Sequence, residues 1–315
     1  MVLLDAFLEH RPEAVAAVAT FDHGSGASAA EAVELVVGVC LRRSVPVVAG
    51  KIAADAGRMA VGGARLAVRS GPLADGCERT ADGVQRKAYS FSSVRPTEAT
   101  WRAERWRFLR AVAEEHRATI VTAHTLDDQA ETVAMRILRG ASARGLAAMA
   151  VRTAGVARPL LGVPRLAIAE YAAARGVAFL DDPSNTNSRH LRNRLRVDFM
   201  RAASAVRPGF VAELCAIGDR AASWRRALAE LVDGLEVQVV GQSLVVAASA
   251  LDDIDAAGRA VLWPELAGRV GLTMDRRGVA RAAAWSITAL AGQGIPLSGG
   301  ASIERTARTF VIRTA

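Results

Sequence analysis

The chain has 315 residues, and 51% of them are hydrophobic, so it is long enough to fold into two domains with separate cores. Forty lysine and arginine residues against 32 acidic residues give a formal net charge of +8, which favours a polyanionic partner. Cys40, Cys77 and Cys215 form no C-x-x-C pair, which argues against a structural zinc site, an iron–sulfur cluster or a secreted disulfide framework.

Helix and strand patterns alternate in the N-terminal part of the chain. Apolar residues at helical spacing predict a helix over 2–10, and apolar runs predict strands over 14–21 and 45–49. Between these strands, residues 28–43 have the pattern of a helix with one buried face. The alternation predicts an α/β fold with a doubly wound parallel sheet. Residues 53–96 are rich in Gly, Ala, Arg and Ser and lack a sustained period, so they are predicted to be an irregular insertion.

A helix is predicted from Thr97, which is suited to cap it, through Val112. Arg102 and Arg105 lie on this helix, and their pattern alone does not assign them a function. It favours a solvated helix face covered by their aliphatic stems.

A strand followed by a helix with an acidic first turn marks the centre of the chain. Residues 119–123 predict a short buried strand, and Thr125 is suited to cap a helix that ends at Gly140. The predicted buried stripe of this helix comprises Leu126, Ala130, Val133, Ala134, Ile137 and Leu138. The opposite face carries His124, Asp127, Asp128 and Glu131. Because open α/β sheets bind ligands beyond the carboxyl ends of their strands, these residues indicate a site for polyphosphate with Mg²⁺ or for a cationic substrate. An ordinary solvated helix start is the alternative.

Four arginines follow an acidic turn near residue 190. A helix over 165–175 capped by Gly176 and a last strand over 177–180 are predicted before this turn. The arginines are Arg189, Arg192, Arg194 and Arg196. Guanidinium groups at this density suit phosphate binding through paired hydrogen bonds, and an exposed basic helix is the alternative.

The composition changes around residue 205, so we predict an α/β domain over 1–205 and a smaller α+β domain over 206–315. The elements predicted in the second domain are a helix over 210–231, a hairpin over 235–247 that turns at Gly241, helices over 250–268 and 276–291, and short strands within 295–313.

Several motifs occur in the order in which one known family carries them. They are Phe21-Asp-His-Gly24, residues 98–106, residues 123–132 with Arg136 and Arg139-Gly140, Gly145-Leu146 with Met149, Arg158-Pro-Leu-Leu161, Tyr171, Asp182-Pro-Ser-Asn185 and Arg192-Asn-Arg-Leu-Arg196. As an ordered set they resemble the tRNA(Ile)-lysidine synthetase family. That family lies within the PP-loop ATP pyrophosphatase superfamily, whose fold is adenine nucleotide α-hydrolase-like.

The resemblance implies a cytoplasmic ligase that uses ATP and Mg²⁺ and acts on tRNA(Ile) with a CAU anticodon and free L-lysine. The wobble cytidine would attack the α-phosphate of ATP, and lysine would then displace AMP from C2, which changes decoding from AUG to AUA. Matching positions imply catalytic roles for Asp128, Glu131, Arg102 and Arg196, with the two carboxylates holding lysine and helping to deprotonate it. They imply nucleotide binding by Asp22, His23, Gly24, His124 and Asp127, and tRNA binding by Arg105, Arg189, Arg192, Arg194 and the domain over 206–315.

One departure from the family concerns its Ser-Gly-Gly-x-Asp-Ser loop, which is not in the printed chain and would precede Val2. The domain over 1–205 is therefore expected to be truncated at its N-terminus and to bind ATP poorly, with the Mg²⁺ ligand in the missing loop. A non-catalytic or decayed tRNA-binding paralogue stays open for this reason. A tRNA thiolase of the same superfamily is less favoured, because it normally needs paired cysteines. No membrane contact is expected, and a homodimer is one of the assemblies that the sequence allows.

The ligase hypothesis makes a geometric demand: Asp128 and Glu131 must lie within a lysine's length of Arg196.

Overall fold

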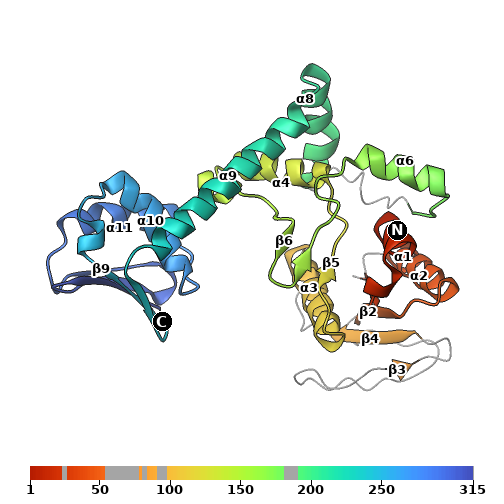
Figure 1. Cartoon of the computed structure of the whole chain (residues 1–315), viewed down its shortest axis with the longest axis horizontal. Coiled ribbons are helices and arrows are strands. Elements are labelled where there is room, and N and C mark those ends of the chain that lie inside the picture. Colours follow the sequence, from red (N-terminus) through yellow and green to blue (C-terminus); the bar gives the residue numbers. More distant parts are fainter. Residues whose placement is uncertain (23–26, 54–77, 80–83, 91–97, 181–190, 315) are drawn as a thin grey trace, which may run out of the picture. The chain divides into compact units, whose positions relative to one another are not determined.

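The computed structural model describes residues 1–22, 27–53, 78–79, 84–90, 98–180 and 191–314 (Figure 1). The chain forms two compact units. The N-terminal unit comprises residues 1–140 and 148–218, and the C-terminal unit comprises residues 141–147 and 219–315. The division lies within helix α9 (Phe210–Asp233), beyond the compositional change near residue 205.

Helices and strands alternate through the first half of the N-terminal unit, as the sequence predicts. In chain order they are α1 (Val2–His10), the 3₁₀ turn η1 (Pro12–Ala14), β1 (Val18–Asp22), α2 (Ala27–Arg42), β2 (Val47–Ala53), β3 (Glu78–Arg79), β4 (Gln85–Ser90) and α3 (Glu98–Glu115). The second half contains β5 (Ile120–Val121), α4 (Leu126–Leu138), β6 (Arg152–Thr153), β7 (Val156–Ala157), α6 (Arg165–Arg175), α7 (Leu191–Arg194), the π-helical turn η3 (Leu195–Met200) and α8 (Arg201–Val206).

The first part of the N-terminal unit is a four-stranded sheet with helices on both faces. Its strand order is β1-β2-β4-β3, in which β1, β2 and β4 are parallel and β3 pairs antiparallel with β4. Side chains of β2 alternate between the two faces: Val47 and Ala49 pack with Val37 of α2, whereas Val48 packs with Phe108 of α3. This arrangement confirms the predicted α/β class with a parallel, doubly wound sheet.

The prediction of an irregular segment over 53–96 is wrong for residues 85–90. Strand β4 lies in this range and pairs with β2 from Val48↔Gln85 to Ala53↔Ser90. Its sequence, Gln-Arg-Lys-Ala-Tyr-Ser, has no apolar alternation, so the strand is defined by its neighbour rather than by its own pattern. Most of the remaining range lies outside the described residues.

A strand forms within 119–123 as predicted, but the prediction that it is buried is wrong. Strand β5 has only two residues, Val121 is 40% exposed, and the strand pairs in parallel with β7 in a separate three-stranded sheet of order β5-β7-β6. The strand predicted over 177–180 does not form, and its Phe179 is 63% exposed. Residues 177–180 pair with no strand in the described part of the chain. An apolar composition without a pairing partner is therefore not enough to form a strand here.

Helix α4 begins and ends where the sequence predicts. The hydroxyl of Thr125 accepts a hydrogen bond from the backbone N–H of Asp128, and Gly140 follows the helix with a φ of 67°. Ala130, Val133 and Ala134 are buried as predicted, and they pack with four residues of later segments, Leu195, Met200, Leu214 and Cys215. The predicted stripe is wrong in the last turn, where Ile137 and Leu138 are 44% and 60% exposed.

The C-terminal unit is the predicted small α+β fold. Its elements are α5 (Ala143–Leu146), the C-terminal part of α9, β8 (Val237–Val240), β9 (Ser243–Ala247), the 3₁₀ turn η4 (Ser249–Leu251), α10 (Ala256–Gly268), α11 (Arg276–Thr288), β10 (Gly294–Pro296), the 3₁₀ turn η5 (Ser298–Gly300), β11 (Ser302–Arg305) and β12 (Thr309–Arg313). The strands form an antiparallel sheet of order β10-β11-β12-β9-β8, and Gly241, with a φ of 61°, makes the predicted hairpin turn.

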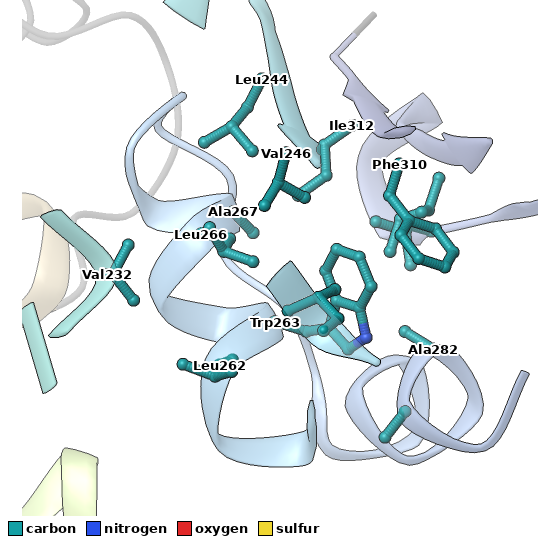
Figure 2. Close-up of a cluster of buried hydrophobic side chains, with 14 of the residues drawn as sticks. Val232, Leu244, Val246, Leu262, Trp263, Leu266, Ala267, Ala282, Phe310 and Ile312 are labelled. Atoms are coloured by element: carbon teal, nitrogen blue, oxygen red, sulfur yellow. The ribbon is translucent and has the colours of Figure 1, made fainter. Parts of the chain in front are cut away.

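Trp263 is at the centre of the C-terminal core. It is fully buried, its indole N–H donates to Ser286 Oγ, and its ring meets Phe310 edge to face at 5.5 Å (Figure 2). Leu266 of α10 and Ile312 of β12 are buried in the same cluster, so α10 and the sheet share one core.

Among the described residues, no helix combines the length and the apolar character that a membrane span requires.

Candidate active site

An ion-pair network joins Glu131 of α4 to the arginines of residues 191–196. Arg196 Nε lies 2.6 Å from Glu131 Oε1, and Arg196 Nη2 lies 3.0 Å from Oε2. Arg192 Nε lies 2.9 Å from the same Oε2. Glu131 is only 2% exposed. Both of its oxygens are therefore held by charge-assisted hydrogen bonds in a site with little water.

Asp128 lies one helical turn before Glu131, and its two carboxylate oxygens have different partners. Oδ2 accepts hydrogen bonds of 2.9 Å from both the backbone N–H and the hydroxyl of Thr125, which completes a capping box at the start of α4. Oδ1 lies 3.1 Å from Arg192, 3.4 Å from Arg165 and 3.5 Å from Arg196. Burial raises the pKa of Asp128, but the Thr125 hydrogen bonds and the charges of Arg165 and Arg192 outweigh it, so the pKa lies below its ordinary value.

Arg196 reaches Glu131 because η3 packs on α4. Leu195 and Met200, on either side of Arg196, are buried against the apolar face of α4. The π-helical geometry of η3 is a feature that often occurs at functional sites. The hydrogen bond to Glu131 raises the pKa of Arg196 in spite of burial. The geometric demand of the ligase hypothesis is met, since Asp128, Glu131 and Arg196 lie in direct contact.

Asp127 has a structural partner at the start of α6. Its Oδ2 accepts a 2.7 Å hydrogen bond from the backbone N–H of Arg165, the first residue of that helix. Pro164, at the N-cap position, supplies no side-chain cap. The carboxylate of Asp127 therefore caps α6 and ties it to α4.

A group of cations surrounds His124 at the carboxyl end of β5. Thr122 Oγ1 lies 2.8 Å from His124 Nδ1. Burial lowers the pKa of His124, and the charges of Arg158, Arg192 and Arg102 lower it further against the opposing effect of Asp128. Burial and the charges of Arg102 and Arg192 likewise lower the pKa of Arg105. We call Arg102, Arg105, Arg158 and Arg192, whose charges act on His124 or on one another, the cationic group; their mutual repulsion favours an anionic ligand.

Glu131 also lines a small cavity of about 200 Å³. Its charged walls are formed by Asp127, Glu131, Arg165 and Arg196, and Arg201 is also present. Met200 and Val211 give it an apolar part. Three guanidinium groups and two carboxylates line it, so its net charge is positive, and its carboxylates can pair with a cationic ligand only when guanidinium groups are displaced.

The structure does not bring every predicted site residue to this place. Asp22 lies at the end of β1, on the four-stranded sheet, where its carboxylate is 3.6 Å from Lys51 Nζ of β2. Arg194 is exposed on α7. His23, Gly24 and Arg189 lie outside the described residues.

Three residues near the site carried no role in the sequence analysis. Arg165 pairs with Asp128, Arg158 belongs to the cationic group, and Gln129 is buried with its side-chain amide hydrogen-bonded to both backbone groups of Met149. Arg158 lies in a family motif, which could have indicated it. Arg165 and Gln129 have no comparable signal, because their partners are distant in the sequence.

Within the part of the chain that the structure describes, no cluster of three or more His, Cys, Asp or Glu side chains is arranged to hold a metal ion. The described residues therefore do not form a protein-built metal cage, and the predicted Mg²⁺ ligand remains a prediction.

Comparison with known proteins identifies the class to which this fold and this site belong. The family model of the PP-loop domain matches residues 76–203, which contain α4 and the arginines that pair with it. Residues 76–203 thus match a PP-loop domain.

Its relatives define the family more closely. A tRNA(Ile)-lysidine synthase of Burkholderia pseudomallei is 36% identical over 193 residues, 57% of this chain and 39% of the relative. That of Ralstonia nicotianae is 46% identical over 32% of this chain and 23% of the relative, and that of Mycobacterium tuberculosis is 38% identical over 62% and 61%. The chain is thus similar in sequence to tRNA(Ile)-lysidine synthases, and it spans less than two thirds of the length of these relatives.

A solved structure, the U34-tRNA thiolase NcsA from Methanococcus maripaludis with its [4Fe-4S] cluster, covers 70% of this chain and 79% of its own. Its TM-score of 0.38 and identity of 14% are too low to carry an argument about this chain.

Proposed function

We propose that this protein is a tRNA(Ile)-lysidine synthetase, which uses ATP to join lysine to C2 of the wobble cytidine of tRNA(Ile). The observation that carries the proposal is the contact between the carboxylates of α4 and Arg196, at 2.6 Å from Glu131 and 3.5 Å from Asp128. Groups that attract a phosphate and groups that attract an ammonium ion thereby meet at one place, and the reaction needs both.

The cationic group fits the first step. When the cytidine O2 attacks the α-phosphate of ATP, negative charge builds up on the phosphoryl oxygens and pyrophosphate leaves. Arg102, Arg105 and Arg158 can bind these oxygens while the ion pairs of Glu131 stay intact, because none of the three arginines pairs with Glu131 in those contacts. His124, with its lowered pKa, is neutral near pH 7 and is proposed to contact the nucleotide as a hydrogen-bonding group rather than as a cation. The family resemblance implies that Mg²⁺ accompanies the ATP, and when bound it would supply further positive charge beside the phosphates.

The carboxylates fit the second step. The lysine ammonium loses a proton, which Glu131 is proposed to accept, and the free amine attacks C2 of the adenylated cytidine and displaces AMP as the C2–O bond breaks. Asp128 has a lowered pKa, so it is a weak base and is suited to binding the ammonium form. This narrows the role expected from the sequence, in which both carboxylates would also help to deprotonate lysine. The cavity beside Glu131 provides room for the aliphatic part of the lysine.

The ion pairs imply an order of binding. Arg165, Arg192 and Arg196 already neutralise Asp128 and Glu131, so an ammonium ion has to compete with three guanidinium groups. Phosphates of ATP and RNA are the natural competitors for those guanidiniums. We therefore propose that polyanion binding draws arginines away from the carboxylates and that lysine then takes their place.

The test is transfer of labelled lysine to tRNA(Ile) with a CAU anticodon in the presence of ATP. Glu131→Gln keeps the size of the side chain and removes its charge, and we expect transfer to fall about 100-fold or more. Glu213→Gln is the matched control, because Glu213 forms an exposed ion pair with Arg207 and does not line the cavity. Equal transfer by the parent and by Glu131→Gln would remove this carboxylate from the mechanism.

The two alternatives give different outcomes in the same assay. A non-catalytic tRNA-binding protein binds tRNA(Ile) but transfers no lysine under any condition. The thiolase alternative is not favoured by the cysteines, since Cys40 packs in the core of the four-stranded sheet and Cys215 in the core beside α4, while Cys77 lies outside the described residues.

A further inference from the structure

A cleft of about 590 Å³ opens in the N-terminal unit between the second half of α3 and the β6–β7 hairpin. Its walls include Trp106, Arg110 and Arg117 from the α3 side and Thr153, Gly155 and Arg158 from the hairpin side. The volume lies in the range of ligand-binding pockets, which is about 300–1,000 Å³. None of these residues has a role in the ligation proposed above except Arg158.

The charges and the ring in this cleft suit a nucleotide. Three arginines and one carboxylate, Glu114, line it, so its net charge is positive. The Cζ atom of Arg110 lies 6.0 Å from the centroid of the Trp106 ring, within the range of a cation–π contact. Indole rings and guanidinium planes are the surfaces on which proteins stack unpaired bases, and arginines hold the adjoining phosphates.

Arg158 has a buried donor that faces no acceptor in the described part of the chain. Its Nη1 donates to the carbonyl oxygen of Ala150 at 2.9 Å, but its Nε is buried without a hydrogen-bond partner. Buried donors of this kind are rare in folded proteins and are commonly satisfied by a ligand or a water molecule. Arg158 also lines the cleft, so its guanidinium charge is available to a phosphate bound there.

Helix α3 connects this cleft with the candidate active site. Arg102, Trp106 and Arg110 are spaced four residues apart and so lie along one face of the helix. Arg102 belongs to the cationic group, and the two arginines are separated by about 12 Å along the axis. Arg158 joins the two places from the other side, because its charge acts on His124 while its side chain lines the cleft.

We propose that this cleft binds a nucleotide of the RNA strand next to the one that reacts, with the base against Trp106 and its two flanking phosphates against Arg110, Arg117 and Arg158. The identity of the RNA rests on the proposed function. The positive charge and the aromatic ring of the cleft do not depend on it. A free mononucleotide shares that chemistry and is distinguished by the experiment.

The experiment measures binding, not transfer. Fluorescence anisotropy of the full chain is recorded with a labelled anticodon stem-loop of tRNA(Ile), with a short unstructured oligoribonucleotide and, by competition, with AMP. We expect Trp106→Leu to weaken both RNA probes about tenfold, which is the size of one base stack. The double variant Arg110→Gln, Arg117→Gln should reduce the slope of log K against log salt by about 1.4, because two phosphate contacts are lost. AMP should be unaffected by either.

Arg107→Gln is the matched control. Arg107 lies on the same helix, pairs with Glu104 at 2.8 Å and does not line the cleft, so its removal should change neither affinity nor salt slope. Circular dichroism and the melting temperature establish that each variant folds. Unchanged RNA affinity in Trp106→Leu with an unchanged salt slope in the double variant overturns the proposal. A loss confined to AMP also overturns it and assigns the cleft to a mononucleotide. Because the unstructured probe needs no lysine transfer, a positive result stands even if the ligase assay fails.

Discussion

Two buried charges, one in each unit, are satisfied in different ways. In the C-terminal unit, Arg259 is 5% exposed, and its three nitrogens donate to the carbonyl oxygens of Ile254, Leu251 and Ser286. In the N-terminal unit, Glu131 is 2% exposed and is bound by the side chains of Arg192 and Arg196. Main-chain oxygens cannot leave without unfolding, whereas long arginine side chains can rotate away. The first arrangement is suited to holding a fold, and the second to exchanging partners.

The environments of the two charges support this distinction. Arg259 donates to the carbonyl oxygen of Leu251, which belongs to the same apolar core as Trp263 and Ile312. Figure 2 shows part of this core. Glu131 adjoins a cavity and the cationic group, so a ligand can approach it. A buried charge next to a cavity is a better indicator of a functional site than burial alone.

The largest effect is expected from Glu131→Ala. The change leaves Arg165, Arg192 and Arg196 around the single carboxylate of Asp128. Because these arginines are 27–43% exposed, the expected cost is about 2–3 kcal/mol, between that of an exposed and that of a buried ion pair. Urea unfolding of the N-terminal unit measures it. A loss below about 1 kcal/mol, the size of a surface ion pair, would mean that the network is not buried in solution.

The next effect concerns catalysis and separates Arg196 from an ordinary phosphate anchor. Arg196→Ala should slow the adenylation step about 100-fold, the usual effect of losing one group that stabilises the transition-state charge. Affinity for tRNA(Ile) should fall less. Arg207→Ala removes an arginine from an exposed ion pair and is the control. Pyrophosphate release measures adenylation, and filter binding measures tRNA affinity. If affinity falls more than the adenylation rate does, Arg196 only binds a phosphate.

A smaller loss of stability, about 2 kcal/mol, is expected from Arg259→Met, because three carbonyl oxygens lose a donor while the apolar stem is replaced. The melting of the C-terminal unit should shift, and adenylation should not. If adenylation falls as far as it does in Arg196→Ala, Arg259 is more than a structural charge and the contrast between the two units is lost.

The smallest effect concerns pH. Folding lowers the pKa of His124, so the unfolded chain binds a proton first as the pH falls. The stability that neutral His124 contributes is complete above its ordinary pKa of about 6.5 and is lost as the pH falls through the lower folded value. His124→Asn should therefore lose less melting temperature than the parent between about pH 7.5 and pH 5.5, by about 1–3 °C. His10→Asn, at an exposed position on α1, is the control. Parallel curves for parent and His124→Asn would contradict the shift.

Local signals in the sequence predicted α4 well. The Thr125 cap, the acidic first turn and Gly140 each act within one or two helical turns, so the sequence contains all the information that these features need. Strand β4 could not be predicted in this way, because its polar residues form a strand only through pairing with β2. The apolar residues of 177–180 show the converse, since their pattern predicts a strand but the structure forms none there.

The site shows the same division between local and distant information. The sequence placed Asp128 and Glu131 on the polar face of α4, as helical spacing requires. It did not predict the burial of Glu131, because the arginines that cover it lie 61 and 65 residues further along the chain. Arg165 has no local signal at all, and only the packing of α6 near α4 brings it to Asp128.

The central claim is that the guanidiniums on Asp128 and Glu131 are exchanged for the ammonium group of a substrate. Equilibrium dialysis with labelled lysine tests it most directly, in the absence and in the presence of ATP and tRNA(Ile). The account predicts weak binding of lysine to the protein alone and binding strengthened at least about tenfold once the polyanions are bound, with no such gain in Glu131→Gln. Equal lysine affinity with and without the polyanions, or the same gain in Glu131→Gln, would contradict the account.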